Sequence, residues 1–69
     1  MKLHKIIKKI FKKQLSVVKI EITGDLLAIH LSRVTGQELE WLYKTFIPEY
    51  DLLLGTEDEN ITVQIFKND

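Results

Sequence analysis

Apolar residues near the start of the chain recur at intervals of three and four positions. On an α-helix, which turns about 100° per residue, this spacing gathers them on one stripe. Lysines occupy most of the remaining positions, and no acid interrupts them. We therefore predict a helix over residues 2–14 with one apolar side and one basic side. The apolar stripe consists of Leu3, Ile6, Ile7, Ile10 and Phe11.

Two alternating segments separated by Gly24-Asp25 predict a β-hairpin. A two-residue loop with glycine first suits a type II′ turn, because that position requires a positive φ. The turn also fixes a register that places the six large apolar residues on one face, whereas a slip of one residue would divide them between both faces. The predicted pairs are Val18 with Leu31, Ile20 with Ile29, Ile22 with Leu27 and Thr23 with Leu26.

A second helix is expected after Thr35. Thr35 and Glu38 have the spacing of a capping box, in which each side chain accepts a hydrogen bond from the other residue's backbone N–H. Pro48 makes the helix end or kink, because the residue before a proline avoids helical geometry. Trp41 falls on the polar side of this helix. The apolar stripe consists of Leu39, Leu42, Tyr43, Phe46 and Ile47.

After Pro48 the hydrophobic pattern does not distinguish a strand from a helix at every position. Residues 51–54 form an apolar run that fits either a short strand or the end of a helix. Residues 55–60 are polar and predict a loop. Alternation returns with Ile61, Val63 and Ile65, which predicts a final strand.

These elements predict an α+β fold in a single domain spanning residues 1–69. The element order is αββαβ, or αββαββ if residues 51–54 form a strand. The simplest arrangement is a two-layer sandwich, with two helices on one face of a three- or four-stranded antiparallel sheet. The other face would meet water or a second copy of the chain. We expect it to carry Val17, Lys19, Glu21, Ala28, His30, Thr62, Gln64 and Phe66.

Charge is divided unevenly along the chain. Residues 1–19 carry seven lysines and no acid, whereas residues 20–69 carry ten acids and three basic residues. The net charge of zero therefore combines a part of charge +7 with a part of charge −7. This asymmetry indicates contact with phosphate, a membrane surface or an acidic partner.

The basic side of the first helix is the first candidate binding site. A row of ammonium groups can neutralise several phosphates, but base edges are read mostly by Arg, Asn and Gln, so any nucleic-acid contact would be to the backbone. Membrane docking is disfavoured, because the sheet needs the apolar stripe as cover. The alternative is an ordinary solvated helix side. The candidate residues are Lys5, Lys8, Lys9, Lys12 and Lys13.

Trp41 is the second candidate. An exposed tryptophan offers a large rigid contact area and is a frequent anchor at protein interfaces. The alternative is that its ring packs between the two helices, because small domains use every aromatic side chain in their core.

Other chemistry finds little support in the sequence. The chain has no cysteine, which fits a reducing compartment, so a cytoplasmic location is the default. No apolar run is long enough to span a bilayer.

His4 and His30 stand apart from any nucleophile or ligand pattern, there is no phosphate-binding loop, and the acidic residues 57–59 lack the spacing of a calcium loop. We expect no enzyme activity, no metal and no cofactor.

We therefore expect a small non-enzymatic interaction module that binds a protein partner. The split charge also permits a homodimer. The compact, Ile- and Lys-rich chain is compatible with an inhibitor or accessory factor of a phage or mobile element. The alternative function is a nucleic-acid binder that contacts the backbone, without sequence specificity, through the lysines of the first helix.

Overall fold

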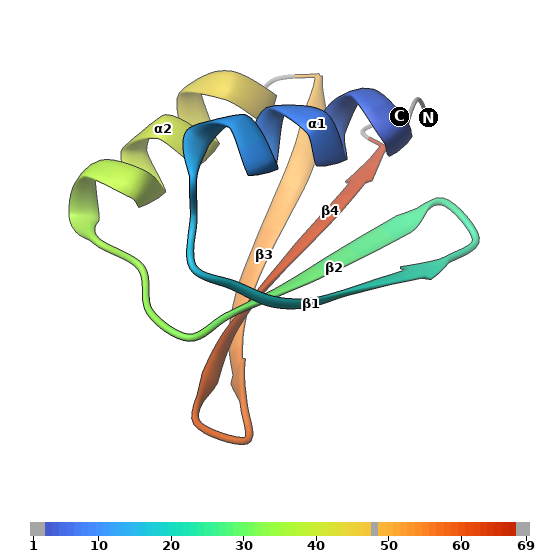
Figure 1. The fold of residues 1–69 in the computed structure, drawn as a ribbon. Coiled ribbons are helices and arrows are strands. Elements are labelled where there is room, and N and C mark those ends of the chain that lie inside the picture. Colours follow the sequence, from blue (N-terminus) through green and yellow to red (C-terminus); the bar gives the residue numbers. More distant parts are fainter. Residues whose placement is uncertain (1–2, 48, 68–69) are drawn as a thin grey trace.

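The computed structural model describes residues 3–47 and 49–67 and forms two layers (Figure 1). The strands form one antiparallel sheet in the order β1-β2-β4-β3, and both helices lie on the same face of it. The predicted α+β sandwich is confirmed in its four-stranded form, with order αββαββ. The elements are α1 (Leu3–Lys13), β1 (Val17–Thr23), β2 (Leu26–Leu31), α2 (Gly36–Phe46), β3 (Tyr50–Glu57) and β4 (Asn60–Lys67).

Both helices begin and end close to the predicted residues. Helix α1 ends where Gln14 adopts a φ of 65°, and the expected start at residue 2 lies outside the described residues. At the start of α2 the capping box is present: the Glu38 N–H donates to Thr35 Oγ1 at 3.1 Å, and the Thr35 N–H donates to Glu38 Oε1 at 2.8 Å. Helix α2 ends at Phe46, and Pro48 lies outside the described residues.

The β1–β2 hairpin has the predicted turn. Gly24 has a φ of +58°, while Asp25 is not among the residues of positive φ, as a type II′ turn requires. The predicted pairs from Thr23–Leu26 to Ile20–Ile29 are confirmed.

The same hairpin departs from the prediction at its far end. A β-bulge lies between Val17 and Lys19, so Leu31 pairs with Val17 and the predicted pairing with Val18 is wrong. The extra residue of the bulge also turns Val17 towards the core, where the open face was expected, and leaves the Val18 side chain 53% exposed.

The β3–β4 hairpin is longer than predicted. Residues 51–54 belong to a strand and not to the end of a helix, the two possibilities that the sequence left open. That strand continues to Glu57. The expected loop over residues 55–60 is therefore reduced to a two-residue turn at Asp58 and Glu59, whose φ values are 50° and 69°. The outer part of this hairpin carries polar, exposed residues, so no apolar alternation marks it in the sequence.

The core lies between the sheet and the two helices. Of the predicted helical stripes, only Ile6, Ile10, Leu42 and Phe46 are fully buried, because the neighbouring positions lie on the flanks of each helix. The largest side chains with almost no exposure are Ile10, Leu27, Ile29, Leu31, Leu42, Phe46, Val63 and Ile65.

Candidate functional site

Helix α1 presents its lysines to solvent. Ile6 and Ile10 are buried against the sheet, which turns the opposite side of the helix outwards. We call the five exposed lysines of this helix the lysine face; they are Lys5, Lys8, Lys9, Lys12 and Lys13.

No ion pair between the lysine face and an acid is found among the described residues. Within residues 3–47 and 49–67, three ion-pair contacts fall within 4.0 Å, and none includes an α1 lysine. The acids among these residues therefore leave this basic surface unneutralised at short range. The three contacts join Lys19 to Glu21, His30 to Glu21 and Lys44 to Glu40.

Two open hollows lie where α1 meets α2. The first, of about 240 Å³, is lined by three lysines of the lysine face and by Trp41. The second, of about 410 Å³, brings Lys67 of β4 close to Lys5 and Lys9. Sequence reasoning missed Lys67 because it reaches this surface only through the pairing of the last strand.

Tyr50 and Glu49 belong to the wall of the larger hollow. Burial, followed by the neighbouring Glu49 carboxylate, raises the pKa of the Tyr50 hydroxyl. The hydroxyl therefore stays protonated and can donate a hydrogen bond to a ligand that enters this hollow.

Trp41 packs between the helices, the second of the two arrangements considered from the sequence. Its ring meets Phe46 edge to face, with centroids 6.0 Å apart and planes at 83°. The Lys13 ammonium lies 5.6 Å from the centroid of the indole, within the range of a cation–π contact. The ring is half-buried, and its large size lets it reach from the polar side of α2 into the groove.

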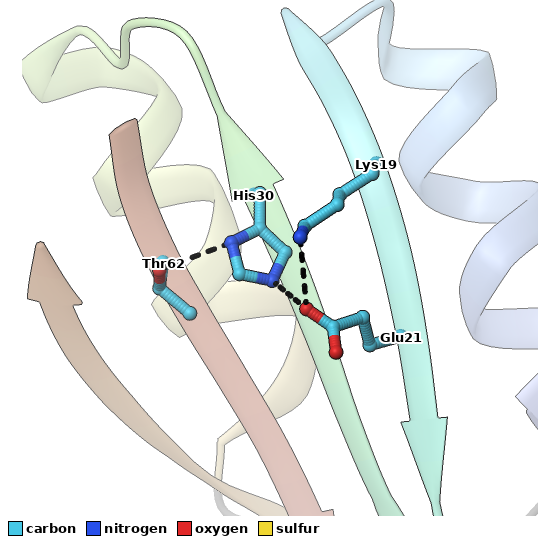
Figure 2. Close-up of polar contacts among 4 residues, drawn as sticks. All are labelled: Lys19, Glu21, His30 and Thr62. Atoms are coloured by element: carbon cyan, nitrogen blue, oxygen red, sulfur yellow. Dashed lines mark hydrogen bonds and ion pairs between the residues drawn. The ribbon is translucent and has the colours of Figure 1, made fainter. Parts of the chain in front are cut away.

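A polar cluster occupies the face of the sheet that no helix covers (Figure 2). The expected neighbours Lys19 and His30 are paired across β1 and β2. Glu21 Oε1 lies 2.7 Å from His30 Nε2 and 3.4 Å from Lys19 Nζ, and Thr62 Oγ1 lies 3.3 Å from His30 Nδ1. The carboxylate is in contact with Nε2, but the geometry is not that of a hydrogen bond.

His30 is buried, contrary to the expectation that this face meets water. It is 3% exposed because β2 is an inner strand, and side chains from β1 and β4 flank the ring on both sides. Lys19 first, and then His30, holds the pKa of the Glu21 carboxyl below its usual value. The cluster is therefore a buried ring clamped between a hydroxyl and a carboxylate.

The described part of the chain contains no group of three His, Asp or Glu side chains arranged to hold a metal ion. Nor does either described helix have the length and apolar character needed to cross a membrane. No protein-family model, curated protein or solved structure matches the chain.

Proposed function

We propose that the protein is a small non-enzymatic interaction module that binds an acidic surface of a protein partner through its lysine face. One observation carries the proposal: five exposed lysines share one side of α1, and no acid of the described chain lies within ion-pair distance of them. A surface helix usually mixes both signs of charge, which favours solubility without favouring a partner.

The absence of counter-charges among the described residues affects the free energy of binding. An acidic partner would not have to displace any ion pair of these residues to reach the ammonium groups. Each new pair at an exposed interface contributes about 0.2–1 kcal/mol, so five lysines contribute moderately to affinity. Their joint field contributes more to the rate of association, because it steers an acidic surface towards α1.

The smaller hollow adds an apolar element to this basic surface. Its lining combines the half-buried Trp41 ring with Lys9, Lys12 and Lys13. An acidic segment with one apolar or aromatic side chain matches both features, since the side chain would cover the exposed part of the indole. Such a combination of apolar centre and polar rim is typical of protein interfaces.

The charge on the rest of the molecule favours a protein over a nucleic acid. Domains that bind nucleic acid usually have an isoelectric point above about 9, whereas this chain has 6.7 and a net charge of zero. A long polyanion would meet the acidic parts of the molecule as well as α1. Binding to a nucleic-acid backbone remains the second candidate, favoured by the absence of any acid from the lysine face.

Affinity capture with two matched variants tests the proposal. In one variant all five lysines of the lysine face become glutamine, and in the other they become arginine, which keeps the charge. We expect the wild type and the arginine variant to retain the same protein from cell extract, the glutamine variant to lose it, and nuclease treatment to change nothing. Equal retention by the glutamine variant would contradict the proposal.

The nucleic-acid alternative makes a different prediction in the same experiment. Nuclease would then release the captured material. Direct titration with duplex DNA of mixed sequence would show affinity falling steeply with salt, and the slope would decrease by about one for each phosphate-contacting lysine removed. Salt-independent binding would exclude this alternative.

A further inference from the structure

Strand β1 forms one edge of the sheet. The strand order β1-β2-β4-β3 gives it a single neighbour among the described strands, β2. In a hairpin with a two-residue loop, the pair next to the loop exchanges both backbone hydrogen bonds, and this alternates along the strand. Thr23, Glu21 and Lys19 therefore bond to β2, while Ile22 and Ile20 direct their N–H and C=O groups to the free edge.

The edge also carries apolar side chains that the fold leaves uncovered. Ile22 and Val18 are each 53% exposed. The alternation of β1 places Ile22 on the helix-covered side of the sheet, whereas Val18 lies in the bulge between Val17 and Lys19, where the alternation is interrupted.

Both residues belong to β1, which has no neighbouring strand on its outer side. Two exposed apolar side chains therefore accompany the unpaired backbone groups of this edge.

We propose that this edge pairs with β1 of a second copy of the chain, antiparallel and with a two-fold axis at Ile20, to make a continuous eight-stranded sheet. The sequence around Ile20 is self-complementary in this register. Ile20 pairs with its own copy, Val18 with Ile22 of the other copy, and Lys19 with Glu21 of the other copy.

Charge complementarity selects the register. Positions 19 and 21 become non-hydrogen-bonded pairs, in which the Cα atoms are about 4.5 Å apart and side chains interact most closely. The proposed register therefore makes two lysine–glutamate pairs across the dimer. A shift by two residues in either direction places Glu21 against Glu21 or Lys19 against Lys19, which is unfavourable.

A lysine on an edge strand commonly prevents pairing with another chain. Here Lys19 lies two residues from Glu21 on the same open face. Within one chain, Lys19 Nζ lies 3.4 Å from Glu21 Oε1. The same carboxylate can accept the lysine of a second copy, so the charge guides pairing instead of blocking it. In the same register, the exposed Ile22 side chain of each copy would lie beside Val18 of the other copy.

The first experiment measures the molecular mass of the protein in solution at several protein concentrations. Sedimentation equilibrium should show a species of twice the 8.1 kDa chain mass at high concentration. Ile22→Pro should abolish it, because proline removes an N–H from the free edge while leaving the bonds to β2. Thr56→Pro is the matched control at the opposite edge, on β3, and should leave the dimer intact.

A charge exchange tests the register itself. Lys19→Glu alone and Glu21→Lys alone should each weaken the dimer by about tenfold or more, since like charges then face each other twice. Mixing these two variants should restore dimer formation, because each glutamate then meets a lysine. Circular dichroism should show that every variant is folded.

Three results would overturn the inference. They are a monomer at every concentration, a dimer that Thr56→Pro disrupts and Ile22→Pro does not, and a mixture of the charge variants that associates no better than either variant alone. The lysine-face variants of the preceding section change none of these residues, so this inference and the proposed function can fail separately.

Discussion

Glu21 Oε1 lies 2.7 Å from Nε2 of His30, a histidine that is buried on the one face of the sheet that no helix covers. Lys19 and Glu21 shield the ring from the β1 side, and Thr62 holds it from the β4 side (Figure 2). The uncovered face thus gains a small polar core of its own, in which a strand pairing, a charge contact and a hydrogen bond support each other.

The first prediction concerns acid stability. Because Lys19 and His30 lower the pKa of Glu21 in the folded state, its ionised form favours folding. That contribution is present above the ordinary value of 4.5 and is lost as the pH falls through the folded-state pKa. Glu21→Gln should therefore lower the urea midpoint at neutral pH, and the difference from the wild type should shrink in acid.

Glu57→Gln is the control for this comparison, because Glu57 makes no ion pair within 4.0 Å in the described chain. It should change the urea midpoint little at either pH. A Glu21→Gln difference that stays the same at neutral and acid pH would show that the carboxylate charge does not contribute to stability.

The second prediction concerns the hydrogen bond between His30 and Thr62. Both side chains are buried and their polar atoms are 3.3 Å apart, so removing one partner leaves the other unsatisfied. We expect Thr62→Val to cost about 1 kcal/mol of unfolding free energy and His30→Ala about 2 kcal/mol, which includes a cavity. The double variant should cost about 0.5–1.5 kcal/mol less than the sum. Additive costs would mean that the two side chains do not interact.

The hairpin and the capping box could be predicted from the sequence because independent signals agree there. At Gly24 the turn chemistry and the apolar alternation require the same register, and at Thr35 the cap coincides with the start of a helical stripe. The bulge could not be predicted in the same way. Val17 and Val18 are adjacent valines, so either can face the core without changing the hydrophobic pattern.

The polar cluster shows a second limit of sequence reasoning. Local patterns do not give the order of strands, and here β4 returns to lie beside β2 and makes it an inner strand. His30 was expected beside Lys19, and it is, but its burial depends on Thr62, which lies 32 residues further along the chain. The approach of Lys67 to the lysine face has the same origin.

The third prediction concerns Trp41, the single tryptophan of the chain. Because its half-buried ring packs against Phe46, we expect Trp41→Ala to lower the unfolding free energy by about 2–3 kcal/mol. Trp41→Phe should recover most of this loss. Lys13→Ala removes the cation over the ring and should cost less than about 1 kcal/mol. Urea unfolding followed by circular dichroism measures all three variants, and a loss below about 0.5 kcal/mol for Trp41→Ala would contradict the packing role.

The last prediction compares the two hairpin turns. Each turn contains a residue of positive φ, which is a glycine in the first turn (Gly24) and a glutamate in the second (Glu59). Gly24 occupies a left-handed conformation that suits glycine, so Gly24→Ala should destabilise the fold by about 1 kcal/mol. Glu59 occupies such a conformation at a φ of 69° with a full side chain, in a turn where Asp-Gly is a favoured sequence. Glu59→Gly should therefore raise the unfolding free energy by about 0.5–1 kcal/mol, even though glycine usually destabilises a chain. Glu57→Gly, made in the adjoining strand, is the control and should lower it, because strand positions lose stability with glycine. If Glu59→Gly were as destabilising as Glu57→Gly, the turn at Asp58 and Glu59 could not have the left-handed geometry that closes the β3–β4 hairpin.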